Sequence, residues 1–388
     1  YTMRFISASH IFSGLSFLPE NTVIVINDAN AICDIISKNE IGLNHLELHK
    51  GIISPGFINT HCHLELSHLQ NEIPQKTGIV NFALDIIKKR NTKSIESIEL
   101  AMHEADAYMK TQGIVAVGDI SNTNYSLKKK KKSSLYYHTF VELIGLNPSN
   151  SSLVFNNGLK LYNEFSENKL STSFAPHAPY SSSTDLITLI SNFCETILKP
   201  TSIHNQESIA ENLFFETKTG DYLKLYESLG LNIDYFNATG KTSLQSILSS
   251  FNSEVNTLLV HNTFSNSADI ENANQLHKKL FWCLCPNANL YIENTLPNIE
   301  LLLSKNCNIT LGTDSLASNS TLSIIDEINV IKQYFPGTTT ETLLKMATYN
   351  GALFLGIDHQ FGEIKIGKTP GLNLITEENE KFKVTKLI

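Results

Sequence analysis

The sequence predicts an α/β fold in which a (β/α)8 TIM barrel carries a small β-sandwich domain built from both chain ends. Short apolar runs alternate with amphipathic helical patterns through the middle of the chain, and β-like runs occupy both ends. The chain has 388 residues, 41% of them hydrophobic, which is long enough for one large domain and a smaller one.

Eight candidate strands define the barrel. They cover residues 53–61, 113–121, 136–145, 171–179, 201–205, 257–262, 280–288 and 308–315. Helical spacing of apolar residues lies between them, as in Ile95, Ile98, Met102, Ala105 and Met109, or in Leu186, Leu189, Ile190, Phe193 and Ile197. An open doubly wound sheet is the main alternative, but no glycine-rich dinucleotide motif follows any candidate strand. Eight strand–helix units therefore favour the barrel.

The two chain ends share a β pattern. Alternating runs at residues 3–12, 21–28 and 31–37 are separated by turn residues, and similar runs cover 362–376 and 381–388. We therefore expect residues 1–54 plus 356–388 to form one composite β domain and residues 55–355 to form the catalytic barrel.

Composition excludes several classes of partner. The formal charge of −8 and a pI near 5.9 argue against a nucleic-acid surface. No apolar run approaches membrane-spanning length, and the six scattered cysteines form no CxxC pair, so we expect a cytoplasmic protein with a small-molecule substrate.

Two features of the basic residues matter for the substrate. Only Arg4 and Arg90 are arginines, so arginine recognition of a phosphate or carboxylate is nearly excluded. The lysine run at 128–132 is interpreted as part of a solvated loop, with a lysine-lined entrance for an anionic substrate as the alternative.

Polar residues occur at the carboxyl ends of five candidate strands, where barrel active sites are built. His61 and His63 are two residues apart on one strand and so point the same way, whereas Cys62 points away. The set is completed by His177, His204, His261 and Asp314. Histidine nitrogens with one carboxylate suit zinc, and also iron, manganese or nickel. His61, His63, His204 and Asp314 could therefore hold one divalent metal, most readily zinc.

Glu207 follows His204 by three residues and can lean over the same barrel mouth. A carboxylate there could carry protons between water and a leaving group. The alternative is a first-turn helix glutamate, since the residues from 207 onwards have a helical pattern.

The motifs "PGFINTHCH", "APHAPYS", "HNQE", "VHN" and "GTDSLASN" together resemble the metal-dependent amidohydrolase superfamily. Within it they resemble the branch of chlorohydrolases and amino-heterocycle deaminases, which includes guanine, S-adenosylhomocysteine and aminodeoxyfutalosine deaminases. The resemblance implies that His61, His63, His204 and Asp314 bind the metal and that Glu207 shuttles protons. It also implies that His261 orients the attacking hydroxide and that His177 contacts the substrate.

The expected reaction is hydrolytic deamination of an aminated N-heterocycle. Metal-activated water attacks the amine-bearing carbon, Asp314 accepts the proton of that water, and Glu207 protonates the ring nitrogen. No lysine lies within "FAPHAPYS" to bridge two metals, so the resemblance favours a single metal ion. Relatives are often dimers, which leaves a homodimer open.

The substrate is less well defined by the sequence. Relatives that act on S-adenosylhomocysteine often hold its amino-acid carboxylate with arginines in the loop after the third strand. Residues 145–165, the matching region here, contain no arginine, which lowers the expectation that S-adenosylhomocysteine is the substrate. The segment "HLELSH", with Glu65 and His68, resembles the aminodeoxyfutalosine group, so a purine nucleoside-type substrate is favoured. Glu65 is a candidate for binding a substrate amine or ribose hydroxyl, with a structural role as the alternative.

Two other functions remain open from the sequence. One is a different hydrolase of the same superfamily, which opens a cyclic amide or removes chloride from a heterocycle. The other is a non-catalytic binding or scaffold protein on the same fold.

Overall fold

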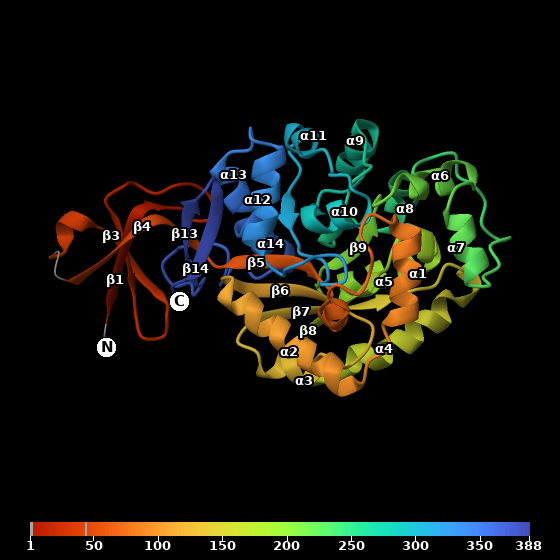
Figure 1. The fold of residues 1–388 in the computed structure, drawn as a ribbon, viewed down its shortest axis with the longest axis horizontal. Helices are drawn as coiled ribbons and strands as arrows, with labels where there is room; N and C mark the ends of the chain where they lie inside the picture. Colours follow the sequence, from red (N-terminus) through yellow and green to blue (C-terminus); the bar gives the residue numbers. More distant parts are fainter. Residues whose placement is uncertain (1–2, 43–44) are drawn as a thin grey trace.

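A computed structural model describes residues 3–42 and 45–388 and contains three β-sheets. Two are four-stranded parallel sheets surrounded by helices, and the third is a six-stranded mixed sheet beside them (Figure 1). The strands are β1 (Arg4–Ile11), β2 (Thr22–Ile26), β3 (Ile32–Ser37), β4 (Leu46–Pro55), β5 (Phe57–Cys62), β6 (Ile114–Ser121), β7 (Tyr136–Leu143), β8 (Ser171–Pro176), β9 (Thr201–Asn205), β10 (Thr257–His261), β11 (Leu280–Leu284), β12 (Ile309–Leu311), β13 (Leu372–Glu378) and β14 (Lys381–Lys386). The helices are α1 (Ile79–Lys89), α2 (Ile95–Thr111), α3 (Leu127–Lys132), α4 (Ser151–Glu167), α5 (Thr184–Thr196), α6 (Ile209–Thr217), α7 (Tyr222–Ser228), α8 (Ser243–Ile247), α9 (Ser267–Leu276), α10 (Pro286–Ile292), α11 (Ile299–Ser304), α12 (Ile324–Tyr334), α13 (Thr340–Ala347) and α14 (Tyr349–Leu355).

All eight strands predicted for the middle of the chain are present. They pair in parallel in the orders β5-β6-β7-β8 and β12-β11-β10-β9. Side chains connect the two sheets at one seam, where the Thr60 hydroxyl donates to the Leu311 carbonyl at 2.9 Å. At the other seam the His204 amide donates to the His177 carbonyl at 3.0 Å. The α/β class and the parallel pairing are therefore confirmed.

The candidate strand at 53–61 is wrong in its extent, because the chain changes sheets within it. Residues up to Pro55 belong to β4 in the six-stranded sheet, and β5 begins at Phe57. Gly56 lies at the change, where a Cβ atom would come within 2.3 Å of Val115 Cγ1 and 2.8 Å of the Pro370 carbonyl oxygen. Only glycine fits this passage between the two parts of the fold.

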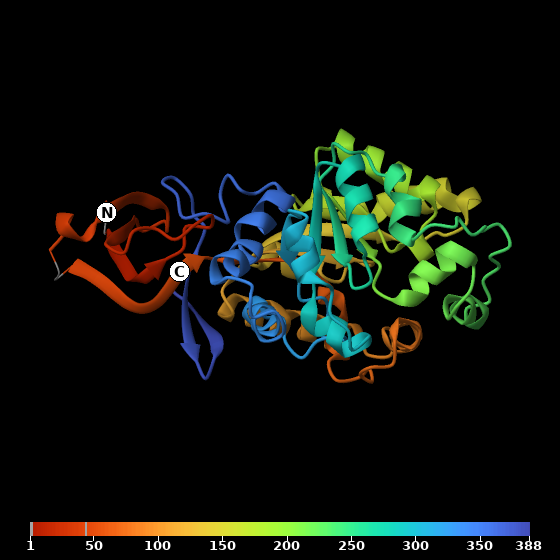
Figure 2. The ribbon, with the colours of Figure 1, turned by 90° about the horizontal axis from the view of Figure 1, so that it is seen from above.

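Both chain ends contribute to the six-stranded sheet, whose order is β14-β13-β4-β1-β2-β3. Figure 2 shows the red N-terminal strands and the blue C-terminal strands together, to one side of the larger part. The β pattern expected over 362–376 is only partly correct, because residues 362–371 form turns and irregular structure and β13 begins at Leu372.

The predicted helical patterns form α2 and α5. In α2, Ile98, Met102, Ala105 and Met109 are buried, whereas Ile95 is about half exposed at the first turn. The hydroxyls of Ser94 and Ser183 cap the two helices by accepting from the amides of Ser97 and Leu186.

The lysine run forms a short helix, α3. For its central residue, Lys130, both the solvated loop and the lysine-lined entrance are wrong. Lys130 is buried and pairs with Asp119 at 2.6 Å. Its ammonium also donates to the hydroxyls of Ser121 and Thr139 at 2.9 and 3.0 Å. The second carboxylate oxygen of Asp119 accepts from the Leu64 amide at 2.8 Å, directly after His63. The pair thus fixes the backbone beside the histidine pair.

No helix among residues 3–42 and 45–388 is both long and apolar enough to cross a membrane.

We predict that Lys130→Met lowers the stability of the protein strongly. Removing one partner of a buried ion pair leaves the other charge uncompensated, at a cost of about 3–5 kcal/mol. Thermal unfolding and denaturant titration measure the loss, and the exposed neighbour gives the matched control Lys128→Met. A double variant, Asp119→Asn with Lys130→Met, should recover part of the loss because no buried charge remains. Equal melting temperatures for Lys130→Met and Lys128→Met would contradict the assignment.

Candidate metal centre and active-site cavity

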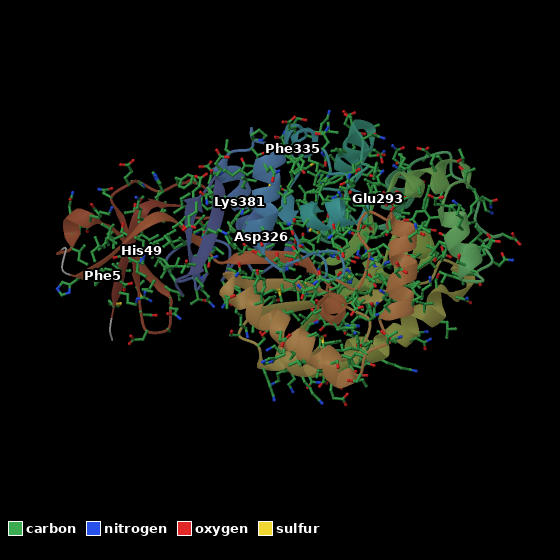
Figure 3. The ribbon with its side chains drawn as sticks, viewed as in Figure 1. Phe5, His49, Glu293, Asp326, Phe335 and Lys381 are labelled. Atoms are coloured by element: carbon green, nitrogen blue, oxygen red, sulfur yellow. The ribbon has the colours of Figure 1, made fainter. Side chains whose placement is uncertain are left out.

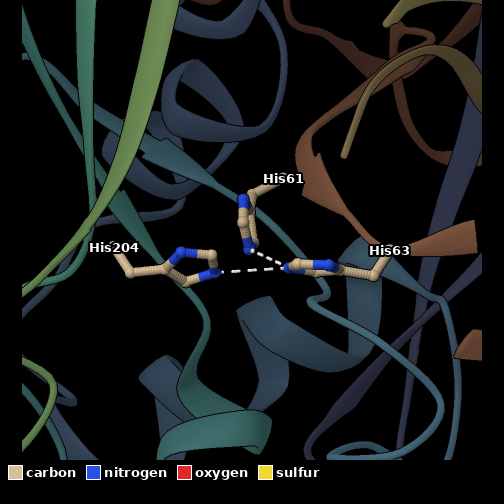
Figure 4. A group of neighbouring side chains, drawn as sticks. All are labelled: His61, His63 and His204. Atoms are coloured by element: carbon tan, nitrogen blue, oxygen red, sulfur yellow. Dashed lines mark hydrogen bonds between the residues drawn. The ribbon is translucent and has the colours of Figure 1, made fainter. Parts of the chain in front are cut away.

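Three histidine side chains converge at the carboxyl ends of β5 and β9. The Nε2 atom of His63 lies 3.1 Å from Nε2 of His61 and 3.3 Å from Nε2 of His204 (Figure 4). His61 is on β5, His63 directly follows that strand, and His204 is on β9. The strand periodicity that predicts a common direction for His61 and His63 is thus matched by the structure.

Asp314 adds a carboxylate to this group. Its Oδ1 atom lies 3.6 Å from His61 Nε2 and 3.5 Å from His63 Nε2. The other oxygen accepts from the Ser318 hydroxyl at 2.6 Å, and the Asp314 amide donates to the His61 carbonyl at 3.1 Å. The backbone of Asp314 is left-handed, with φ of 57°, a conformation that non-glycine residues adopt rarely and that often marks functional sites.

The donor set fits a divalent metal. Zinc–nitrogen bonds of about 2.0–2.1 Å in a tetrahedron put neighbouring ligand atoms about 3.3 Å apart, close to the nitrogen separations found here. The Nδ1–H of His204 donates to the His177 carbonyl at 2.6 Å, which leaves the Nε2 lone pair of His204 facing the group. Burial lowers the pKa of His63 to about 3 and that of His61 well below its usual value, so both rings are neutral and able to ligate.

Glu207 and His261 lie beside the metal-ligand group. Glu207 Oε1 is 3.6 Å from His261 Nε2, and both side chains are buried. Helix α6 begins at Ile209 with Ser208 as its N-cap, so Glu207 precedes the helix and the first-turn interpretation is wrong. Burial, reinforced by the charge of Asp314, raises the pKa of Glu207 well above its ordinary value. This shift favours the protonated acid over the carboxylate.

Asn289, on α10, is a site residue that the sequence patterns do not reveal. Its amide nitrogen donates to His261 Nδ1 at 3.2 Å and to the Thr263 hydroxyl at 3.0 Å. This contact leaves the proton of His261 on Nε2, directed toward Glu207. The left-handed backbone of His261, with φ of 79°, is a second sign of a constrained site.

These residues share one cavity of about 160 Å³. Its lining contains six predicted site residues, His63, His177, His204, Glu207, His261 and Asp314. His61 lies behind them with 1% of its surface exposed. The structure therefore brings the predicted metal ligands and the predicted catalytic residues together.

Three further polar residues of the lining, Arg90, Asn122 and Glu142, were not predicted. Arg90 follows α1 and lies at the cavity, where it donates to Asn122, so the expectation that bidentate arginine recognition is nearly excluded stays a prediction. Helix α1 itself is fixed by Glu293, whose carboxylate accepts from the Ile79 amide at 2.7 Å (Figure 3).

His177 lies between this cavity and a second one of about 520 Å³, which shares Ala83, Ile87, Ile144 and Tyr180 with the first. The Ser181 hydroxyl donates to the Ala178 carbonyl at 3.2 Å and accepts from His177 Nδ1 at 2.6 Å. The Nε2 atom of His177 is thus left without a proton, as an acceptor.

Glu65 and His68 lie outside the lining of these two cavities. Glu65 is buried, and its Oε2 atom accepts from the amides of Asn122 and Thr123, both at 3.1 Å. His68 contacts the carbonyls of Glu65 and Arg90 at 3.1 and 3.0 Å. Glu65 therefore supports the loop that carries Asn122 into the cavity.

We predict that zinc raises the melting temperature of the metal-stripped protein, because the ion binds the folded chain through a site that unfolding destroys. Differential scanning fluorimetry with and without zinc measures the shift. His63→Ala and Asp314→Asn should each remove it, and His359→Ala, which changes an exposed histidine, should keep it. A zinc shift retained in both ligand variants would exclude this site.

We predict that Glu65→Gln becomes increasingly stabilising as pH rises from about 5 to 8. Burial raises the pKa of Glu65 to about 7 from an ordinary value of 4.5. Between these values the folded chain holds a proton that the unfolded chain releases, so wild-type stability falls as pH rises. The difference in melting temperature between the variant and the wild type isolates this effect. A difference independent of pH would show that Glu65 does not titrate in this range.

Solved structures with a similar fold include deaminases and chlorohydrolases. Helicobacter pylori aminofutalosine deaminase in complex with methylthio-coformycin superposes with a TM-score of 0.80 at 23% identity, covering 98% of this chain and 93% of that one. Zinc-bound atrazine chlorohydrolase from Arthrobacter aurescens superposes with a TM-score of 0.73 at 15% identity, covering 95% of this chain and 86% of that one.

Sequence relatives carry deaminase names. An adenosine deaminase of Helicobacter pylori is 26% identical over 85% of this chain and 80% of the relative. An aminodeoxyfutalosine deaminase of Nitratiruptor sp. is 25% identical over 84% of this chain and 78% of the relative. The profile of the amidohydrolase family matches residues 52–388, which confirms the resemblance carried by the motifs: the chain belongs to the amidohydrolase family.

Proposed function

We propose that the chain is a metal-dependent hydrolytic deaminase of an aminated N-heterocycle, with a purine nucleoside-type substrate, for which an aminodeoxyfutalosine-like compound is favoured. The observation that carries this proposal is the buried acid Glu207, which shares one cavity with His63, His204 and Asp314, with His61 converging on the same histidines from behind the lining. Displacing an amine requires activated water and a proton for the departing nitrogen, and this site offers groups for both.

His61, His63, His204 and Asp314 would hold one divalent metal, with zinc favoured. When bound, the metal supplies a hydroxide nucleophile at neutral pH, because it lowers the pKa of water to about 7.

The chain's own residues would move the protons. Asp314 accepts the proton that water loses, and Glu207 protonates the ring nitrogen while the amine-bearing carbon is attacked. His261, with its proton on Nε2, stabilises the oxyanion that forms. The C–N bond then breaks: Glu207, now deprotonated, takes the proton of the newly added hydroxyl group, Asp314 gives its proton to the departing amine, and ammonia leaves with both carboxyl groups back in their starting states. Water is consumed and no redox change occurs.

His177 would contact the substrate, as the resemblance implies. The proposed role of Glu65 is less direct, because its carboxylate supports the backbone of Asn122. A contact of Glu65 with a substrate amine or hydroxyl stays a prediction.

The comparisons favour a deaminase over the two alternative functions. The curated relatives named above are deaminases at about a quarter identity, whereas the chlorohydrolase neighbour is 15% identical. A scaffold protein would have no need of a complete ligand set beside a buried acid. Assays of ammonia against chloride or ring-opened products separate the hydrolases.

The larger architecture is part of the proposal. We infer that the two four-stranded sheets are halves of a closed (β/α)8 barrel over residues 55–355, supported by a side-chain hydrogen bond across one seam and a backbone hydrogen bond across the other. Residues 1–54 and 356–388 would form the small β-sandwich, supported by a shared apolar core that includes Ile6, Ile24, Ile53 and Leu372. A homodimer and a cytoplasmic location stay predictions.

We predict that Glu207→Gln retains the metal and loses about 10²- to 10⁴-fold in kcat, the range typical of a lost general acid–base group. Ammonia release and metal analysis by mass spectrometry measure both properties. Glu167→Gln, on the exposed face of α4, is the control and should keep full activity. Near-wild-type turnover in Glu207→Gln would remove this residue from the mechanism.

The substrate is tested with a panel of adenosine, 5′-deoxyadenosine, aminodeoxyfutalosine and guanine, assayed for ammonia release. The proposal expects the highest kcat/KM for an adenine nucleoside. A preference for the free base, or ammonia release from none of these compounds by metal-loaded protein, would overturn it.

A further inference from the structure

Glu142 is a buried carboxylate of the cavity that the proposed reaction does not use. It lies near the end of β7 with 9% of its surface exposed. Its Oε2 atom accepts from the Asn122 amide at 2.9 Å, whereas Oε1 has no hydrogen-bond partner in the described part of the chain. A buried carboxylate oxygen at a cavity wall is costly unless a donor satisfies it.

Neighbouring side chains hold Glu142 in this orientation. Arg90 donates from Nη2 to the side-chain oxygen of Asn122 at 3.2 Å, so the nitrogen of that amide must face Glu142. Arg90, Asn122 and Glu142 therefore form a hydrogen-bonded row along one wall of the cavity. Oε1 accepts no hydrogen bond within this row. It lies 3.8 Å from His204 Nδ1, whose proton goes to the His177 carbonyl, so Oε1 can still accept from a ligand.

A second metal ion is one candidate for this position. Glu142, His177 and His204 have ligand atoms within 4.8 Å of one another. However, the Nδ1 atom of His204 already donates to the His177 carbonyl, and its Nε2 atom belongs to the three-histidine group. Only Glu142 and His177 remain, and two donors do not make a metal site of the usual coordination.

The two remaining groups are both acceptors. In the tautomer that donates from Nδ1 to Ser181, His177 contributes an Nε2 lone pair, and Glu142 contributes Oε1. Two acceptors side by side require two donors from the ligand. Adjacent hydroxyl groups on neighbouring carbons provide such a pair, and a carboxylate binds hydroxyl donors more strongly than a neutral acceptor does.

We propose that Glu142 and His177 bind a vicinal diol of the substrate, which in a nucleoside is the 2′,3′-diol of ribose, and that Glu142 thereby selects ribosides. This inference rests on the proposed function. It places the sugar beside His177, at the border of the second cavity, and the heterocycle toward Glu207 and the metal ligands.

The test combines Glu142→Gln with removal of the substrate hydroxyls. We expect Glu142→Gln to lose about 10- to 100-fold in kcat/KM on adenosine, mainly through KM, as for a hydrogen bond to a charged group. On 2′,3′-dideoxyadenosine the variant and the wild type should agree within about threefold, because the donors are gone. Equal losses on both substrates would overturn the proposal.

The wild type alone provides a second test that does not depend on the folding of the variant. It should prefer adenosine to 2′,3′-dideoxyadenosine by about the same 10- to 100-fold. Lack of such a preference would overturn the proposal. The exposed variant Glu167→Gln is the matched control and should retain the full preference.

Two further measurements separate the alternatives. Glu142→Gln should keep the metal content of the wild type, and loss of a metal equivalent would instead assign Glu142 to a metal. Calorimetric binding of inosine against 2′,3′-dideoxyinosine needs no turnover. If the wild type releases no ammonia yet binds inosine in a Glu142-dependent way, the proposed function fails and the diol site stands. If ammonia is released but inosine and its dideoxy analogue bind equally, only the diol site fails.

Discussion

The fold is constrained by the need to keep three imidazole nitrogens and a carboxylate together in a buried space. Without a cation, His61, His63 and His204 place lone pairs against one another at about hydrogen-bond distance. The Asp314 carboxylate adds negative charge to the same volume. A divalent metal ion shared among these members would relieve the repulsion, and folding of the strand ends would then be coupled to metal binding.

The surrounding contacts keep each ligand in the direction that a metal requires. Asp119 holds the Leu64 amide beside His63, and Lys130 neutralises Asp119 in turn. Ser318 occupies the second oxygen of Asp314. Asp119 and Lys130 come from β6 and α3, which supply no candidate ligand, whereas Ser318 comes from the same loop as Asp314, so the site depends on elements beyond those that carry the ligands.

The sequence predicts the convergence of the candidate metal ligands well because strand geometry is local. Alternation along one strand puts His61 and His63 on the same side, and parallel strands bring their carboxyl ends together. The burial of Lys130 could not be predicted, since a run of five lysines looks solvated until β6 places Asp119 opposite it. The single candidate strand at 53–61 is wrong because the segments on both sides of Pro55 and Gly56 are extended, and only their pairing shows that the chain leaves one sheet for another there.

The sequence patterns did not predict the row of Arg90, Asn122 and Glu142 along the cavity wall. These residues are distant in sequence, and none of them belongs to a recognisable motif. Arg90 follows a helix, Asn122 lies in a loop, and Glu142 ends a strand, and their relation appears only when β6 and β7 pair. The small number of arginines did not indicate that Arg90 would line the cavity, because a count does not say where in the fold a residue lies.

Burial gives the ionisable residues of this cavity different roles. Burial disfavours charge on every ionisable group, but its effect differs in sign for bases and acids. It lowers the pKa of His63 to about 3 and that of His177 to about 4, so both rings are neutral at neutral pH. It raises the pKa of Glu207 well above its ordinary value, which favours the protonated acid. For Asp314 the nearby histidines and the hydrogen bond from Ser318 outweigh burial and bring its pKa below the ordinary value, which favours the anion. One desolvated cavity thus favours neutral imidazoles, a protonated acid and a charged carboxylate together, which is the division of states that the proposed hydrolysis of a C–N bond uses.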